Sequence, residues 1–159
     1  MRVLAIDPGT TESGWVLYDT ETELPVDAGI GDNDIIVQYI STYARAKFDR
    51  IAVEMVASYG MPVGASVFET CVWIGRFVQA AWPTGHHTLV YRKDVKMHLC
   101  GSMKAKDSNI RQALIDRFSA GQGKSVAIGL KASKGPLYGF KSHMWAALAV
   151  AVTWADTNV

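Results

Sequence analysis

The sequence is short of cysteine and of long hydrophobic runs, and each shortage excludes a class of protein. Cys71 and Cys100 are the only cysteines among 159 residues. Each lies in a segment with regular hydrophobic spacing, which favours reduced thiols over a disulfide framework. No apolar run reaches the ~18 residues of a transmembrane helix, and the opening MRVLAI is too short for a secretory signal. We therefore expect one intracellular, cytoplasmic domain over residues 1–159, without membrane association.

The chain also has little net charge, because its positive and negative residues nearly cancel to a formal net charge of +1. The distribution is nevertheless uneven. Residues 1–91 carry five Lys/Arg and eleven Asp/Glu, a net of −6, whereas residues 92–141 carry eleven Lys/Arg and three Asp, a net of +8. A basic segment beside an acidic one is typical of a polyanion-binding surface next to a metal site. An ordinary solvated basic surface is the alternative.

Hydrophobic patterning predicts an α/β fold. Apolar runs predict strands over 2–7, 14–19, 26–31, 49–56 and 87–92, and helical spacing predicts helices after Asp32 or Asn33 and over 65–81, 93–99, 107–118 and 143–155. Trp82-Pro83 is expected to end the second helix, Asp107 to cap the fourth, and 119–141 to be a mobile loop. A hairpin followed by strand–helix units indicates a mixed sheet covered by helices.

Two carboxylates stand where such a sheet can bring them together. Asp7 ends the first predicted strand, and Glu54 lies inside the apolar strand IAVEMV. A buried carboxylate needs a metal, a cation or hydrogen-bond donors, so we expect a joint metal site. A turn-capping Asp7 and a structural ion pair at Glu54 are the alternatives. His143 opens the last helix, where it could ligate a metal, act as a general base or simply cap the helix.

Three segments resemble the RuvC family of Holliday-junction resolvases, in its phage-borne branch. They are AIDPGTTESGWVLYD (5–19), IAVEMV (51–56) and HMWAALAVAVTW (143–154), in the family's order and at about its length. The resemblance implies an RNase H-like fold with a mixed five-stranded sheet flanked by helices, a homodimer, and two Mg²⁺ ions per site, or Mn²⁺. It also implies an endonuclease that cuts four-way or branched DNA junctions by two-metal phosphodiester hydrolysis, in a bacterial or phage-infected cell.

By this resemblance, Asp7, Glu54 and His143 match the family's catalytic, metal-binding positions. The family's final Asp falls three residues after the His143 position, where this sequence has Ala146. Three explanations are open. The chain is an engineered inactive form, or another carboxylate such as Glu69 completes the site, or the protein binds junctions without cutting them.

Basic and aromatic residues extend the predicted DNA surface. Lys96 and Lys106 resemble the family's basic residues near the scissile phosphate. Tyr59 falls where the family stacks an aromatic ring on an unpaired base, although a loop aromatic often packs locally. The further cations that could contact phosphates are Lys104, Arg111, Lys131, Lys134 and Lys141. The helix over 65–81, with Trp73 and Phe77, predicts either a dimer seam or ordinary core.

Other functions compete with the resolvase interpretation. The turn IDPGTTESG also resembles the phosphate loop of the sugar-kinase and actin superfamily, but 159 residues cannot supply the two large lobes of those ATPases. An RNase H-fold nuclease that acts on RNA–DNA hybrids or flaps is a second enzyme hypothesis. A catalytically dead junction-binding protein, motivated by Ala146, is the hypothesis from another class.

Overall fold

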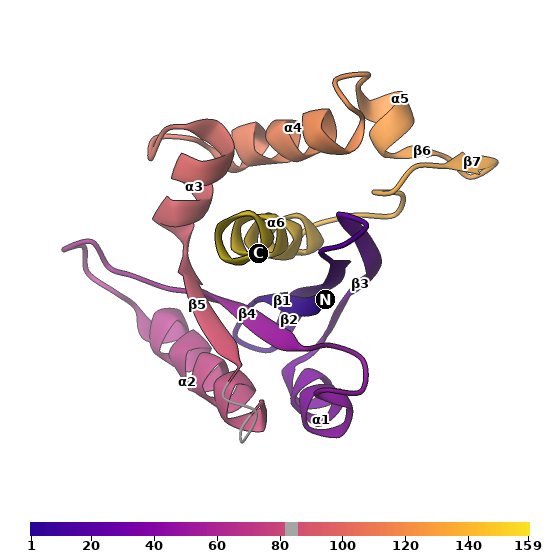
Figure 1. The fold of residues 1–159 in the computed structure, drawn as a ribbon. Coiled ribbons are helices and arrows are strands. Elements are labelled where there is room, and N and C mark those ends of the chain that lie inside the picture. The colour runs from indigo at the N-terminus through magenta and orange to yellow at the C-terminus, as the bar shows by residue number, and fades with distance from the viewer. Residues whose placement is uncertain (82–85) are drawn as a thin grey trace.

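A mixed five-stranded sheet forms the centre of the computed structural model, which describes residues 1–81 and 86–159 (Figure 1). The expected helix stop at Trp82-Pro83 lies outside these residues. The strands are β1 (Arg2–Asp7), β2 (Glu12–Asp19), β3 (Leu24–Asp32), β4 (Arg50–Met55) and β5 (His87–Tyr91), in the order β3-β2-β1-β4-β5. Strands β1, β2 and β3 pair antiparallel, while β4 and β5 run parallel to β1. The predicted mixed five-stranded sheet is thereby confirmed.

Helices cover both faces of the sheet. Helix α6 (Met144–Asn158) lies on one face, with α3 (Arg92–Cys100) and α4 (Asp107–Phe118) packed around it, and α1 (Asn33–Tyr43) and α2 (Ala65–Ala80) lie on the other face (Figure 1). Side chains alternate along a strand. Val3 and Ala5 therefore enter the α6 core, whereas Leu4 and Ile6 enter the α1–α2 core. Burial on both faces explains why the sequence of β1 is almost wholly apolar.

Helix α6 is buried along most of its length, from Met144 to Ala155 except at Ala146. Small residues at Ala147, Ala149 and Ala151 are fully buried, so the helix can approach the sheet closely. This burial accounts for a helix with almost no polar face. The start of α6 lies beside the end of β1 and the beginning of β2.

The segment 119–141 is more ordered than its composition predicted. It contains a short helix, α5 (Lys124–Ala127), and a small hairpin formed by β6 (Gly129–Leu130) and β7 (Ser133–Lys134), which projects from the body (Figure 1). The base of the hairpin is held by a hydrogen bond from the Leu137 amide to the Ala127 carbonyl, 2.8 Å long, and both residues are fully buried. The sequence predicted a mobile loop and did not predict this helix or hairpin, because two isolated buried residues leave no periodic pattern.

Two expectations from composition can be compared directly with the structure. Cys71 and Cys100 are both free thiols. Among the described residues, no helix combines the length and the apolar character that crossing a bilayer requires.

Candidate active site

Asp7 and Glu54 lie next to each other at the carboxyl ends of the two central strands. In the parallel pairing of β1 with β4, Ile6 is opposite Val53, so the residues that follow them are neighbours at the same edge. The Asp7 side chain is 16% exposed and that of Glu54 is 13% exposed. Parallel register therefore brings together two largely buried carboxylates that are 47 positions apart in the sequence.

A buried hydrogen-bond network fixes the turn that follows Asp7. The Gly9 amide donates to Ser13 Oγ at 3.1 Å, the Ser13 hydroxyl donates to Asn33 Oδ1 at 2.6 Å, and Asn33 Nδ2 donates to the Gly9 carbonyl at 3.0 Å. Ser13 and Asn33 are buried. The side chain of Asn33 thus braces the turn rather than capping helix α1, which corrects one of the two capping candidates. The other, Asp32, stands at the N-cap position without a side-chain capping bond.

His143 is held against Asp7 at the start of α6. Its Nδ1 lies 2.8 Å from Asp7 Oδ2, and its side chain is 53% exposed. Gly14 on β2 makes this approach possible, because a Cβ there would lie 2.4 Å from the His143 carbonyl oxygen. The bond through Nδ1 leaves Nε2 free to accept a proton or to bind a ligand. A positive φ of 45° at Ser142 turns the chain into this position.

Arg92 and Asp107 complete the group, although neither was predicted from the sequence to belong to the site. Arg92 opens α3 directly after β5, and its NH1 lies 3.3 and 3.4 Å from the two Glu54 carboxylate oxygens. Its NH2 pairs with the carboxylate of Asp107, the first residue of α4. The cap of α4 comes instead from Asn109, whose Oδ1 accepts the Lys106 amide. Asp107 is thus an ion-pair partner and not the predicted cap.

The electrostatics of this edge favour binding of a cation or a proton. Burial, with a further contribution from the Asp7 charge, raises the pKa of Glu54 to about 7, against the opposing effect of Arg92. Burial also raises the pKa of Asp7, while the hydrogen bond from His143 opposes the shift. Carboxylates that resist ionisation in this way are characteristic of functional sites, although structural ion-pair networks produce the same effect.

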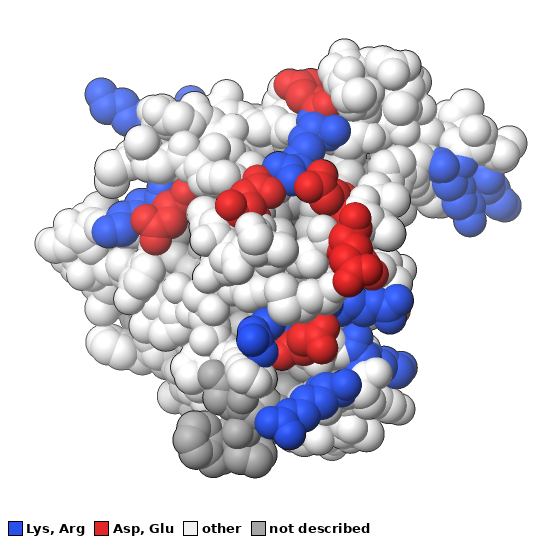
Figure 2. Space-filling view, viewed as in Figure 1, with Lys and Arg blue, Asp and Glu red and all other residues white. Residues whose placement is uncertain are grey.

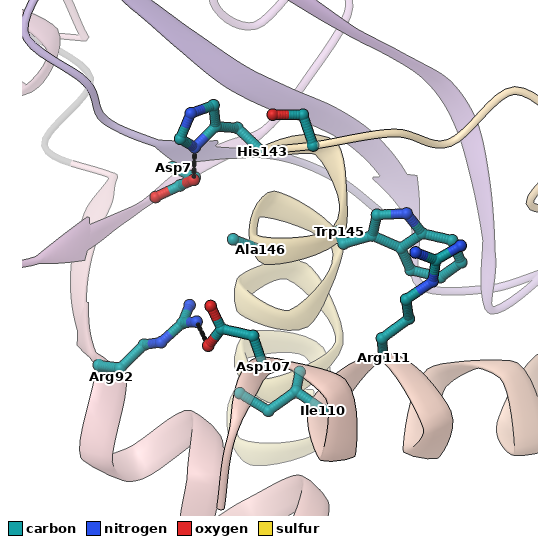
Figure 3. Close-up of a pocket in the computed structure, with 9 residues that line it drawn as sticks. Asp7, Arg92, Asp107, Ile110, Arg111, His143, Trp145 and Ala146 are labelled. Carbon is teal, nitrogen blue, oxygen red and sulfur yellow. Dashed lines mark hydrogen bonds and ion pairs between the residues drawn. The ribbon is translucent and has the colours of Figure 1, made fainter.

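A cavity of about 450 Å³ opens over this group (Figure 3). In Figure 3 the His143–Asp7 pair lies at one end, the Arg92–Asp107 pair at the other, and the methyl group of Ala146 faces the space between them. The lining residues are Asp7, Arg92, Asp107, Ile110, Arg111, Ser142, His143, Trp145 and Ala146. Glu69, the substitute carboxylate that the sequence suggested, is exposed on α2 and does not line this cavity.

The side chains that line the cavity, with Glu54 beside them, are of the types that bind a hard divalent cation. Carboxylate oxygens from Asp7, Glu54 and Asp107, with one imidazole, form the donor set that Mg²⁺ and Mn²⁺ accept. One cation already stands among them, since the Arg92 guanidinium pairs with two of the three carboxylates. Within the described parts of the chain, no three His, Cys, Asp or Glu side chains converge as ready ligands. A metal ion would therefore compete with Arg92 for the same oxygens.

The predicted DNA-contacting residues fall into two separate groups. Tyr59, 58% exposed and with a φ of 48°, lines a smaller cavity of about 160 Å³ with Arg92, Lys93, Lys96 and Met103. Lys104 and Lys106 are exposed on the α3–α4 connection, and Arg111 on α4 stacks 4.5 Å from the Trp145 ring centroid. Lys141 is exposed just before His143. Of this group, Arg111 lines the main cavity, and Tyr59 and Lys96 line the smaller one.

Lys131 and Lys134 form the second group, on the β6–β7 hairpin. Figure 2 shows Lys and Arg atoms at the projecting hairpin without acidic neighbours, while the rest of that face mixes both signs. On the face shown, the acidic and basic parts of the sequence are therefore not separated into two surfaces.

The sheet order β3-β2-β1-β4-β5, with helices on both faces, is an RNase H-like fold, as the sequence predicted. The fold is RuvC-like: a structure of Thermus thermophilus RuvC matches with a TM-score of 0.69 at 20% identity, over 99% of this chain and 96% of that one. A structure described as T. thermophilus RuvC in complex with Holliday junction substrate matches with a TM-score of 0.69 at 19% identity, over 98% and 93% of the two chains. No protein-family model and no curated protein matches the chain.

Proposed function

We propose that this chain is a structure-selective endonuclease that binds four-way or branched DNA and hydrolyses its phosphodiester bonds with Mg²⁺ or Mn²⁺. The observation that carries the proposal is the placement of Asp7 and Glu54 at one sheet edge, with His143 bonded to Asp7, in a RuvC-like fold. One of the two matched structures is described as T. thermophilus RuvC in complex with Holliday junction substrate. Fold alone supports many functions, so the site has to carry the argument.

Each residue of the site has a definite task under this proposal. Asp7, Glu54 and His143 would hold divalent ions, which when bound would supply an activated water and neutralise the leaving oxygen. His143 is hydrogen-bonded through Nδ1 to Asp7, so Nε2 is the ring nitrogen that would bind a metal ion or move a proton. Arg111, Lys96, Lys104 and Lys106 would contact the DNA backbone around the cavities. Tyr59 is exposed enough to stack on an unpaired base.

A cleavage assay tests the proposal most directly. A labelled four-way junction, a linear duplex, a flap and an RNA–DNA hybrid are incubated with Mg²⁺ or Mn²⁺ and with this chain, Ala146→Asp or Asp7→Asn. We expect cleavage of the junction alone, which Asp7→Asn abolishes. Cleavage by Ala146→Asp only would identify the chain as a disabled resolvase. Cleavage of the hybrid or the flap but not the junction would contradict the junction proposal and favour the RNase H-type nuclease.

A junction-binding protein without catalytic activity is the second candidate. Ala146 removes the carboxylate expected on α6, and Arg92 already forms ion pairs with Glu54 and Asp107. Tight binding of junctions by both this chain and Ala146→Asp, with no cleavage in either metal, would select this candidate and overturn the enzyme proposal.

We also propose that the chain acts as a homodimer through helix α2. Phe68 and Val72 on this helix are 62% and 63% exposed, and a pair of exposed large apolar side chains is typical of an interaction surface. Trp73 and Phe77, for which the sequence left a dimer seam and ordinary core both open, differ in burial. Phe77 is fully buried in the core, and Trp73 packs partly against that core beneath Arg76.

A further inference from the structure

The wall of the cavity lacks a carboxylate on α6 and has one on α4. Ala146 contributes only a methyl group to this wall, and Asp107 lines the same cavity from the neighbouring helix (Figure 3). Helices α4 and α6 therefore face the same cavity. The acidic side chain lies on α4, whereas the family resemblance predicted it on α6.

Arg92 ties Asp107 to Glu54. One terminal nitrogen of its guanidinium pairs with Glu54 and the other with Asp107. Because both nitrogens belong to one planar guanidinium, the two carboxylates lie within the span of a single cation.

Asp107 is fixed in position and is also accessible. It is the first residue of a 12-residue helix whose Ile110, Leu114 and Ile115 are buried, so its backbone does not depend on the ion pair. Its side chain is 84% exposed, and a negative charge at a helix N-terminus is favoured by the helix dipole. Arg92 is the sole ion-pair partner of Asp107 in the described part of the chain.

We propose that Asp107 supplies the carboxylate that Ala146 lacks, and that Arg92 acts as an internal cation that bridges Asp107 and Glu54 until a divalent ion displaces it. This inference rests on the metal-binding site of the proposed function, and it names a ligand that the RuvC resemblance did not assign. The inference also requires a place for the Arg92 side chain after a divalent ion displaces it. Arg92 lines both the main cavity and the cavity of Tyr59 and Lys96, so a displaced guanidinium has an adjacent basic groove in which to meet a DNA phosphate.

The test is binding of Mn²⁺ alone, followed by the electron paramagnetic resonance signal of the free ion, with no DNA present. The variants are Asp107→Asn, Ala146→Asp, both together, and Asp116→Asn as a control on the exposed face of the same helix. We expect Asp107→Asn to weaken Mn²⁺ binding on the order of tenfold or more, because affinity follows the number of charged ligands. Ala146→Asp should restore it in the double variant, and Asp116→Asn should bind as the unmodified chain does.

Several outcomes would overturn the inference. They are unchanged Mn²⁺ affinity in Asp107→Asn, an equal loss in Asp116→Asn, failure of Ala146→Asp to restore binding, or no Mn²⁺ binding by the unmodified chain. Urea unfolding of each variant without metal checks that the fold is retained. Asp107-dependent Mn²⁺ binding without cleavage of any junction would uphold this inference and overturn the proposed nuclease. Junction cleavage that Asp107→Asn leaves unchanged, with equal Mn²⁺ affinity, would do the reverse.

Discussion

Each carboxylate of the site contacts a cationic or hydrogen-bonding side chain. His143 holds Asp7, and Arg92 holds Glu54 and Asp107. These pairs do not remove the cost of burial, because the pKa of Asp7 and that of Glu54 both remain raised. The folded protein without metal therefore carries an unfavourable charge that a bound cation or a proton would relieve.

Glu54 should make the stability of the metal-free protein depend on pH. Its pKa rises from 4.5 to about 7 on folding, so the folded state holds a proton that the unfolded chain has already released. The free energy of unfolding should therefore fall as the pH rises from about 4.5 to 7 and then level off. Glu54→Gln should remove most of this fall and stabilise the protein at pH 8 by up to ~3 kcal/mol, at ~1.4 kcal/mol per pKa unit.

Urea unfolding at pH 5 and pH 8 in the presence of EDTA measures this effect. A smaller fall should remain in Glu54→Gln, because burial also raises the pKa of Asp7. Glu69→Gln, an exposed position on α2, is the matched control and should change stability by less than about 0.5 kcal/mol at either pH. A Glu54→Gln protein that is less stable than the unmodified chain at pH 8 would show that the ionised Glu54 side chain does not destabilise the fold.

Gly14 should be required for the position of His143. An added Cβ would lie 2.4 Å from the His143 carbonyl oxygen and 2.7 Å from its Cβ, and both belong to the start of a buried helix that cannot shift freely. Gly14→Ala should therefore lower the free energy of unfolding by roughly 1–3 kcal/mol, as overpacked cores do, measured by urea unfolding.

Gly75→Ala is the matched control for this substitution. Gly75 lies inside α2 and an added Cβ meets nothing within 4 Å, so alanine should stabilise the helix by roughly 0.5–1 kcal/mol. Equal effects of the two substitutions would show that the contact between β2 and His143 is less tight than the structure indicates.

The β6–β7 hairpin projects from the body of the fold (Figure 1) and carries Lys131 and Lys134. If it contacts the DNA backbone, Lys131→Ala with Lys134→Ala should weaken binding to all junction sequences alike. The slope of log affinity against log salt should fall by up to about two, one for each lost phosphate contact. Fluorescence anisotropy across a salt series measures both quantities.

Arg45→Ala with Lys47→Ala provides a control for the hairpin experiment. These two cations lie between α1 and β4, away from the hairpin and from both cavities. Their removal takes away the same net charge, so it should leave the slope nearly unchanged. An equal change of slope in the two double variants would indicate a general charge effect and no specific contact by the hairpin.

At the scale of the whole molecule, the proposed dimer makes a further prediction. Phe68→Asp with Val72→Asp should place two charges in the α2 interface and convert a dimer into a monomer, since burying unpaired charges is costly. Light scattering coupled to size-exclusion chromatography measures the mass. Ile35→Asp, on α1 and 59% exposed, should leave the dimer intact. A monomeric unmodified chain at micromolar concentration would overturn the proposal.

Much of the architecture could be predicted from the sequence because local hydrophobic spacing indicates where strands and helices form. The apolar runs at β1, β4 and β5 and the all-apolar α6 were placed within a few residues. The hairpin within 119–141 was missed, since two-residue strands and the buried Leu137 leave no periodic signal. Arg92 carried one usable signal, its position directly after a parallel strand, whereas Asp107 carried none.

The sequence by itself determined the sheet, its helical covers and the candidates Asp7, Glu54 and His143, because strand-end position and a charge within an apolar run are local features. Only the tertiary structure decided that Arg92 joins Glu54 to Asp107 and that Asp107 faces the space beside Ala146. The ion pairs of Arg92 with Glu54 and with Asp107 join residues that are 38 and 15 positions apart in the sequence. Asp107 of α4 and Ala146 of α6 share one cavity. These arrangements depend on how helices pack around a sheet, which short-range spacing does not encode.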